Sequence, residues 1–374
     1  MVPGAFEGSV EVEVPINIAL IKYWGKRDEE LIIPLNNSLS LNIDAVYART
    51  RVRGSCSAVV DVVSINGSSL DLSVKKNRRF QGFFDYARIL IRKQLSADAA
   101  DKDVEYRFEV SSVTNFPVGA GLASSAAGFA AIAFAIGVLF KLPMEEVSIL
   151  ARRGSGSACR SVFGGLVEWQ AGNDPSGLDS VAVQRLPTTS WPELRCVIVV
   201  LDESEKEVGS SEGMRRTAAS CELLQYRAST VVPARIQRLL KAYETHHFDE
   251  FARIVMADSN QLHAVCMDSF PPLKYMSDAS WQVIRMVNEF NSDRVRAAYT
   301  FDAGPNACIF LEDADLPNLL DQLHQHFAIP AEVLSRLASS GDCGLTHTPD
   351  IVRKSSFVVK NIIVSTVGGA PRII

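Results

Sequence analysis

In the first half of the chain, apolar and polar residues alternate in four segments. These segments are residues 10–20, 38–53, 58–65 and 104–113. Successive side chains of a strand point to opposite faces of a sheet, so the alternation predicts four β-strands. The pair Asn66-Gly67, directly after the third segment, is typical of a hairpin turn.

Helical spacing of apolar residues dominates elsewhere. The predicted helices are 80–95, 124–139, 143–154 with Pro143 in its first turn, 213–228, 233–245, 249–265, 278–290 and 316–327. Further strands are predicted at 196–201, 297–300, 307–311 and 357–367. Strands and helices without a regular βαβ order indicate an α+β fold. The change of character near Trp191-Pro192 predicts two lobes, residues 1–191 and 192–374.

Composition narrows the class of protein. The 374 residues are 47% hydrophobic and 22% charged, as in a globular protein. Lys+Arg number 38 against 43 Asp+Glu, a net charge of −5, which argues against a nucleic-acid partner because binding needs a basic face. The longest apolar stretch, residues 126–140, is too short to cross a bilayer, so no membrane partner is expected. Seven cysteines without a C-x-x-C pair predict reduced thiols and a cytoplasmic location.

The glycine-rich segment Pro117-Val118-Gly119-Ala120-Gly121-Leu122-Ala123-Ser124-Ser125 is the strongest chemical signal. Glycines let the backbone approach a ligand, and the helix predicted to follow directs its free N–H groups at the segment. With two serine hydroxyls added, these groups would form a cradle for phosphate. A glycine-rich turn with a serine cap and no ligand fits the residues equally well.

Cations gather where the first predicted strand ends. Lys22 and Lys26 flank Tyr23-Trp24. Lysines beside aromatic rings suit a pocket for an anionic substrate. A solvated charge cluster with the lysine stems lying on the surface is the alternative.

Two Gly/Ser turns precede predicted helical segments. In Gly154-Ser155-Gly156-Ser157-Ala158-Cys159-Arg160 an arginine follows the serines, and its fork matches carboxylate or phosphate oxygens. Ser210 stands in a similar turn further along. The alternative for both turns is that the serines only cap helices.

Asp302 lies at the end of a strand-like segment, before the Gly304-Pro305 turn. A carboxylate facing lysines can act as a base or hold an ion pair. It can also simply start an Asx turn. The six histidines have neither H-E-x-x-H nor zinc spacing, so no structural metal is expected.

Taken together, these segments resemble a known superfamily. Residues 117–127 are similar to the second motif of the GHMP small-molecule kinases, and residues 302–306 to the third. Residues 22–28, 154–161 and 210–214 resemble one family within it, the mevalonate diphosphate decarboxylases. The resemblance implies a two-lobed fold, with an N-terminal lobe like the second domain of ribosomal protein S5 and a ferredoxin-like C-terminal lobe. It also implies a homodimer.

The activity that the resemblance implies is ATP-dependent decarboxylation of (R)-5-diphosphomevalonate to isopentenyl diphosphate. ADP, phosphate and CO2 would be released, in the mevalonate pathway of isoprenoid and sterol biosynthesis. Two alternatives stay open. One is a GHMP kinase that phosphorylates mevalonate or phosphomevalonate and stops. The other is a phosphate-ligand sensor without catalysis.

The resemblance also assigns roles to residues. Asp302 would accept or orient the proton of the substrate's tertiary hydroxyl, Lys22 would pair with Asp302, and Arg160 would bind the carboxylate. The expected substrate-binding residues are Tyr23, Trp24, Lys26, Ser155, Ser157, Arg160 and Ser210. The residues expected to hold ATP are Pro117, Gly119, Gly121, Leu122, Ser124 and Ser125, with Ser125 also at Mg²⁺. One departure is Ile32, where family members often carry a polar residue.

Overall fold

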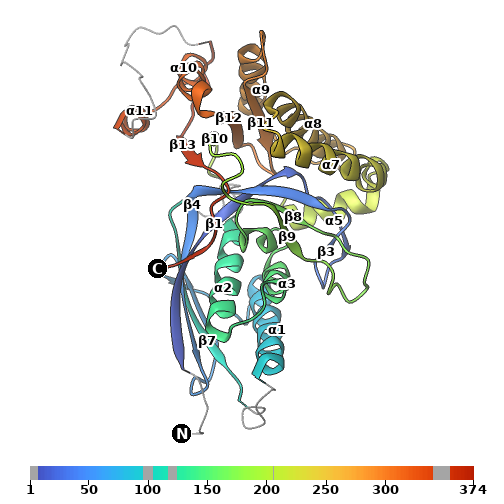
Figure 1. Ribbon diagram of the computed structural model, residues 1–374, viewed down its shortest axis with the longest axis vertical. Coiled ribbons are helices and arrows are strands. Elements are labelled where there is room, and N and C mark those ends of the chain that lie inside the picture. The colour runs from blue at the N-terminus through green and yellow to red at the C-terminus, as the bar shows by residue number, and fades with distance from the viewer. Residues whose placement is uncertain (1–6, 96–103, 117–123, 205, 340–353) are drawn as a thin grey trace.

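The computed structural model describes residues 7–95, 104–116, 124–204, 206–339 and 354–374, without the side chains of residues 76, 124 and 125. Two sheets, each covered by helices, make up most of the molecule (Figure 1). A third, two-stranded sheet of β2 (Lys26–Asp28) and β3 (Ile33–Pro34) lies beside the first.

The larger sheet follows the order β14-β1-β4-β7-β5-β6, and β8 and β9 extend from β4. Its strands are β1 (Gly8–Ile21), β4 (Ser38–Ser55), β5 (Val62–Ile65), β6 (Ser68–Ser69), β7 (Arg107–Thr114), β8 (Leu166–Trp169), β9 (Ala182–Leu186) and β14 (Arg372–Ile373). On one face lie α1 (Arg78–Leu95), α2 (Ser124–Phe140), α3 (Met144–Gly154) and α4 (Ala158–Ser161). The Ala-rich α2 packs against β1 and β4, because its small side chains allow close approach to the sheet.

The second sheet has the order β11-β12-β10-β13. Its strands are β10 (Leu194–Val200), β11 (Ala297–Phe301), β12 (Ala307–Glu312) and β13 (Asn361–Thr366). The helices of this part are α5 (Ser210–Ser220), α6 (Leu223–Tyr226), α7 (Val232–Glu244), α8 (Phe248–Met267), α9 (Asp278–Phe290), α10 (Leu316–His326) and α11 (Ala331–Ser339). Helix α8 contacts both β11 and β1, and so joins the two sheets.

Most of the predicted elements are confirmed. The Asn66-Gly67 turn joins β5 to β6 with φ of 50° and 78°, the left-handed backbone that such a turn requires. The structure adds elements that the sequence did not suggest: β2, β3, β8, β9, β14 and α11. Three of these strands, β2, β3 and β14, have two or three residues, too few for any period to show in the sequence.

Several predicted boundaries were wrong. The predicted helix 213–228 is interrupted after Ser220, and the helical path then continues from Leu223 through a wide π-helical turn, Arg227–Val231, into α7. The predicted helix 233–245 is confirmed as α7, with Pro233 in its first turn, but the chain enters it through this wide turn and not through a loop. Pro143 is the N-cap of α3 rather than part of its first turn, and the last strand begins at Asn361 rather than 357.

The hydrophobic core is continuous from one sheet to the other. One buried cluster includes Ile16 and Leu41 of the first sheet together with Ile198 and Phe251 of the C-terminal half. The C-terminal strand β14 returns to pair with β1. Among the described residues, no helix has the length and apolar character needed to span a bilayer.

Candidate active site

A pocket of about 310 Å³ lies where β1, α4, α5 and the end of β11 meet. Its lining is formed by Ala19, Lys22, Tyr23, Trp24, Lys26, Ile32, Arg79, Ser155, Gly156, Ser157, Arg160, Lys206, Ser210, Ser211, Met214, Leu262, Asp302 and Ala303. Several cations line this pocket, with one carboxylate among the lining residues. This excess of positive charge suits an anionic ligand.

An ion pair between Lys22 and Asp302 forms the charged centre of the pocket. Lys22 directly follows β1 and Asp302 directly follows β11, so two strand ends bring together residues far apart in the chain. Lys22 Nζ lies 2.6 Å from Asp302 Oδ1. The lysine side chain is only 2% exposed, whereas that of Asp302 is 31% exposed. The carboxylate therefore remains reachable for a ligand.

The charges around Asp302 keep it ionised. Burial by itself would raise the pKa of Asp302, but the charge and hydrogen bond of the Lys22 ammonium, together with the charges of Lys206 and Arg160, outweigh the effect of burial. The net pKa is below the ordinary value of 3.8. Asp302 is thus available as a hydrogen-bond acceptor at neutral pH.

Arg160 is buried in the pocket wall without an ion pair among the described residues. Its Nε donates to Asn17 Oδ1 at 3.1 Å and to Ser40 Oγ at 2.9 Å, and Nη1 donates to Ser38 Oγ at 2.7 Å. Burial lowers the pKa of Arg160 below its ordinary value. A buried guanidinium held only by neutral groups is costly unless an anion joins it. The geometry therefore favours an anionic group of the ligand at Arg160.

Tyr23 and Trp24 differ in how they face the pocket. The Tyr23 ring packs edge-on against Trp169 at 4.7 Å, and its buried hydroxyl has no protein partner in the described part of the chain. Burial raises the pKa of Tyr23, so the hydroxyl stays a donor. Trp24 lines the pocket with its ring, but its Nε1 donates to Thr217 Oγ1 at 2.9 Å. The Nε1 of Trp24 is therefore already hydrogen-bonded within the protein and does not donate to a ligand.

The remaining predicted contacts also lie at the pocket. Lys26 pairs with Glu29 at 2.7 Å, and Ser210 Oγ accepts from Lys206 Nζ at 3.2 Å. Ser155 and Ser157 line the wall on either side of Gly156, and Ser157 makes no side-chain cap of α4. The capping alternative is therefore wrong for Ser157. For Ser210 it is wrong as well, since Gly209 is the N-cap of α5.

The predicted ATP-binding segment is only partly described. Pro117, Gly119, Gly121 and Leu122 lie outside the described residues. Ser124 is the first residue of α2 and Ser125 the second, and their side chains are likewise outside the description. The role of this segment, including Ser125 at a metal, stays a prediction.

Three polar residues had no predicted role: Lys206 and Arg79, which line the pocket, and Asn17, which contacts two of the lining residues. Asn17 donates to the Ser157 carbonyl at 2.9 Å and accepts from Arg160, so it connects β1 to the α4 turn. In the sequence, Asn17 could have been noticed as a polar residue within an otherwise apolar part of a strand. Lys206 carried a weak signal, four residues before Ser210, and the exposed Arg79 of α1 carried none.

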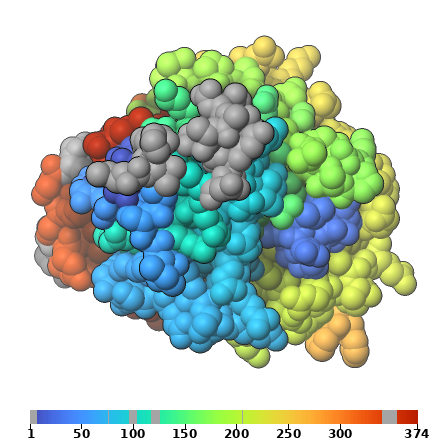
Figure 2. Space-filling model, turned by 90° about the horizontal axis from the view of Figure 1, so that it is seen from below, coloured from blue at the N-terminus to red at the C-terminus, as the bar shows by residue number. Residues whose placement is uncertain are grey.

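The β2–β3 segment covers one side of the pocket. Ile32 has φ of 54°, a left-handed conformation that is unusual for a β-branched residue, and it forms an apolar part of the lining. Buried Arg152 donates to the carbonyls of Leu31 and Gly177, which holds the segment in place. In Figure 2 the blue β2–β3 segment lies at the surface beside yellow-green residues of the α5 region.

Comparison with known proteins assigns the chain to a family. Residues 14–182 match the model of the diphosphomevalonate decarboxylase-like N-terminal domain. Residues 196–374 match that of the mevalonate 5-diphosphate decarboxylase C-terminal domain. The chain belongs to the diphosphomevalonate decarboxylase family.

Individual members of the decarboxylase family agree with this assignment. The diphosphomevalonate decarboxylase of Schizosaccharomyces pombe is 40% identical over 97% of this chain and 93% of its own. The mevalonate diphosphate decarboxylase structure from Trypanosoma brucei is 34% identical, with a TM-score of 0.87 and 98% of each chain covered. A family structure in complex with MVAPP, AMPPCP and magnesium is 30% identical, with a TM-score of 0.76 and 99% of each chain covered. The expected two-lobed α+β fold of the GHMP kinases is confirmed.

Proposed function

We propose that this chain catalyses the ATP-dependent decarboxylation of (R)-5-diphosphomevalonate to isopentenyl diphosphate, with release of ADP, phosphate and CO2. One observation carries the proposal: a reachable, ionised Asp302 paired to Lys22 shares its pocket with a buried Arg160 that lacks an ion pair among the described residues. A decarboxylase for this substrate needs both features, one at the tertiary hydroxyl and one at the carboxylate.

The Lys22–Asp302 pair would act on the hydroxyl. Asp302 would accept or orient the proton of the tertiary hydroxyl. The hydroxyl oxygen would then attack the γ-phosphorus of ATP, and ADP would leave. Lys22 keeps Asp302 ionised. When the new phosphate departs, its oxygen keeps the electron pair of the broken C–O bond. The bond to the carboxylate carbon then breaks, its electron pair forms the double bond, and CO2 is released.

Arg160 would hold the carboxylate before it leaves. The hydrogen bonds from Arg160 to Asn17, Ser38 and Ser40 fix its plane in advance, which lowers the ordering cost when substrate binds. Lys26, Tyr23, Ser155, Ser157 and Ser210 would hold the diphosphate and neighbouring groups, and Trp24 would supply an apolar wall. The pocket lining supports this arrangement.

ATP and Mg²⁺ are the proposed cofactors. A family structure holds AMPPCP and magnesium. Helix α2 begins at Ser124, so its first free N–H groups follow the segment 117–123 that we propose as the phosphate cradle. Magnesium is usually bound through one or two carboxylates and substrate phosphates, and no group of three or more His, Cys, Asp or Glu that could hold a metal occurs among the described residues. We propose that Mg²⁺ enters with ATP, beside Ser125, and neutralises phosphate charge.

The test is release of labelled CO2 from 1-labelled diphosphomevalonate in the presence of ATP. We expect CO2 and ADP in equal amounts. ADP without CO2, from mevalonate or phosphomevalonate, would support the GHMP kinase alternative instead. ATP binding without turnover of any mevalonate phosphate would support a sensor.

We also propose a role in isoprenoid and sterol biosynthesis, a cytoplasmic location, a homodimer and a lobe boundary near residue 191. The six described cysteines are free, which supports a reducing compartment. The path between β9 and β10 leads from one sheet to the other near residue 191, which supports the boundary. Light scattering of the purified chain tests the homodimer, and cell fractionation tests the location.

A further inference from the structure

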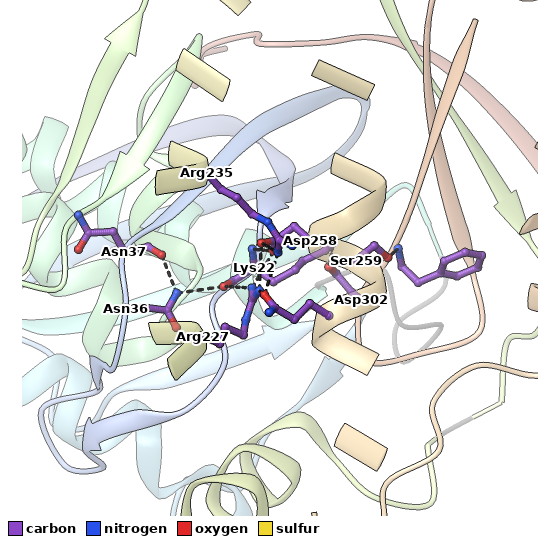
Figure 3. Close-up of polar contacts among 10 residues, drawn as sticks. Lys22, Asn36, Asn37, Arg227, Arg235, Asp258, Ser259 and Asp302 are labelled. Atoms are coloured by element: carbon purple, nitrogen blue, oxygen red, sulfur yellow. Dashed lines mark hydrogen bonds and ion pairs between the residues drawn. The ribbon is translucent and has the colours of Figure 1, made fainter. Parts of the chain in front are cut away.

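Two adjacent residues of α8, Asp258 and Ser259, are buried at 0% and 1% exposure and do not line the pocket. Neither has a role in the proposed chemistry. A fully buried carboxylate is costly unless it is paired, so its partners show what it does. Both residues direct their side-chain oxygens at the backbone beside the charged centre of the site (Figure 3).

Asp258 holds the backbone of Lys22. Its Oδ1 accepts the Lys22 N–H at 2.8 Å, and the carboxylate pairs with Arg227 at 2.7 Å and with Arg235 at 2.8 Å. Arg227 Nη2 also donates to the Lys22 carbonyl at 3.2 Å. The peptide groups on both sides of Lys22 are therefore fixed by one cluster (Figure 3).

Ser259 holds the residue before Asp302. Its Oγ accepts the Phe301 N–H at 2.9 Å, in a buried setting. Consecutive positions of one helix thus fix the backbone from which Lys22 projects and the backbone that leads into Asp302. The two residues that meet in the ion pair come from different sheets, and α8 contacts β1 and β11 at once.

We propose that Asp258, together with Arg227, and Ser259 are positioning residues that set the separation of Lys22 Nζ and Asp302 Oδ1. Lys22 and Asp302 lie just beyond their strands. Among the described residues, and apart from Asn36, which also donates to the Lys22 carbonyl at 3.1 Å, the positioning residues supply the side-chain hydrogen bonds to the backbone at Lys22 and Phe301. A misplacement of about 1 Å can cost on the order of 10²-fold in rate. This inference rests on the proposed function, because it assigns no activity of its own.

The first test compares two buried helix serines that each accept one backbone N–H at 2.9 Å. Ser259 accepts from Phe301, beside the site, whereas Ser148 of α3 accepts from Ala182 and does not line the pocket. Because Ser259→Ala and Ser148→Ala remove the same kind of hydrogen bond, we expect similar decreases in Tm. Only Ser259→Ala should lower kcat, by about tenfold or more, with KM for diphosphomevalonate within about twofold.

The pH profile separates positioning from general weakening. The charged or titratable groups around Asp302 are Lys22, Lys206, Arg160 and His263. If Ser259→Ala loosens the ion pair, the acid limb of kcat moves to higher pH, because Asp302 loses part of what keeps it ionised. In Ser148→Ala the limb should stay where it is in the wild type. Equal kcat and equal limbs in the two variants would overturn the inference.

The second test separates the two arginines of the cluster. Arg227→Lys and Arg235→Lys each weaken an ion pair with Asp258, but of the two only Arg227 contacts the Lys22 carbonyl. We expect kcat to fall at least about fivefold in Arg227→Lys and to stay within about twofold of wild type in Arg235→Lys. Equal kcat in both variants would exclude Arg227 from the positioning role.

A crystal structure of Ser259→Ala gives a readout that does not depend on turnover. A Lys22–Asp302 separation beyond hydrogen-bonding range supports the inference, and an unchanged 2.6 Å contact contradicts it. Absence of CO2 release by the wild-type chain would instead refute the proposed function. The two failures are therefore distinguishable.

Discussion

Asn17 accepts a hydrogen bond from Arg160 at 3.1 Å and donates to the Ser157 carbonyl at 2.9 Å. One amide therefore orients the guanidinium and, at the same time, ties β1 to the serine turn that lines the pocket. The second function of the amide explains why a polar residue occurs among the buried positions of β1.

We expect Asn17→Ala to weaken substrate binding. Without the Asn17 amide, Arg160 loses an acceptor and the Ser157 turn loses its tie to β1, so KM for diphosphomevalonate should rise about tenfold. Asn42→Ala is a matched control, because buried Asn42 also donates to backbone carbonyls, those of Phe163 and Gly369, but neither of these residues lines the pocket. Steady-state kinetics of both variants test the prediction. A similar KM in the two variants would contradict it.

Arg160→Gln should lower kcat/KM by roughly 10- to 150-fold, the range for loss of a hydrogen bond to a charged group. The cause is loss of the cation that we propose to bind the carboxylate. Arg160→Lys keeps the charge but not the planar fork, so it should recover only part of the loss. If kcat and KM are unchanged in Arg160→Gln, the assigned position of the carboxylate is wrong.

Asp302→Asn should bind substrate but lose most turnover. The amide keeps the shape of the side chain but removes the negative charge, which pairs with Lys22 and which we propose to accept the hydroxyl proton. We expect kcat to fall by about 10²- to 10⁴-fold, with KM changed by no more than a few-fold. Single-turnover measurement of ADP and CO2 checks this, and near-wild-type kcat would refute the role of Asp302.

His263 should make the fold sensitive to acid. Burial lowers its pKa from 6.5 to about 4, and the nearby Lys22 ammonium adds to that shift. Between these values the unfolded chain binds a proton that the folded chain does not, so stability falls as pH decreases from about 6.5 toward 4.

His263→Gln removes this proton linkage. Its free energy of unfolding should depend less on pH across the same interval, by about 3 kcal/mol in total. Urea denaturation of both chains at pH 7 and pH 4.5 measures the difference. An identical loss of stability on acidification in both chains would show that other groups cause it.

Sequence patterns were informative wherever a period or a motif is local. The alternation in residues 10–20 and 38–53 predicted the two long strands of the first sheet, because burial on a sheet repeats every second residue. The Gly/Ser motifs and the clustered lysines pointed to phosphate chemistry in the same way. The helical path through Arg227–Val231 was not predictable, since a wide turn leaves no periodic signal.

Lys22, Asp302 and Arg160 were recognisable in the sequence as chemically capable side chains, and their motifs identified the family. Their meeting in one pocket was decided only by tertiary structure, because two sheets, joined by α8, bring together strand ends separated by most of the chain. The same holds for Asn17 and Asp258. In the sequence Asn17 is one polar residue in an apolar segment and Asp258 begins a run of four polar residues. Only packing makes Asn17 an acceptor for Arg160 and Asp258 an anchor of Lys22.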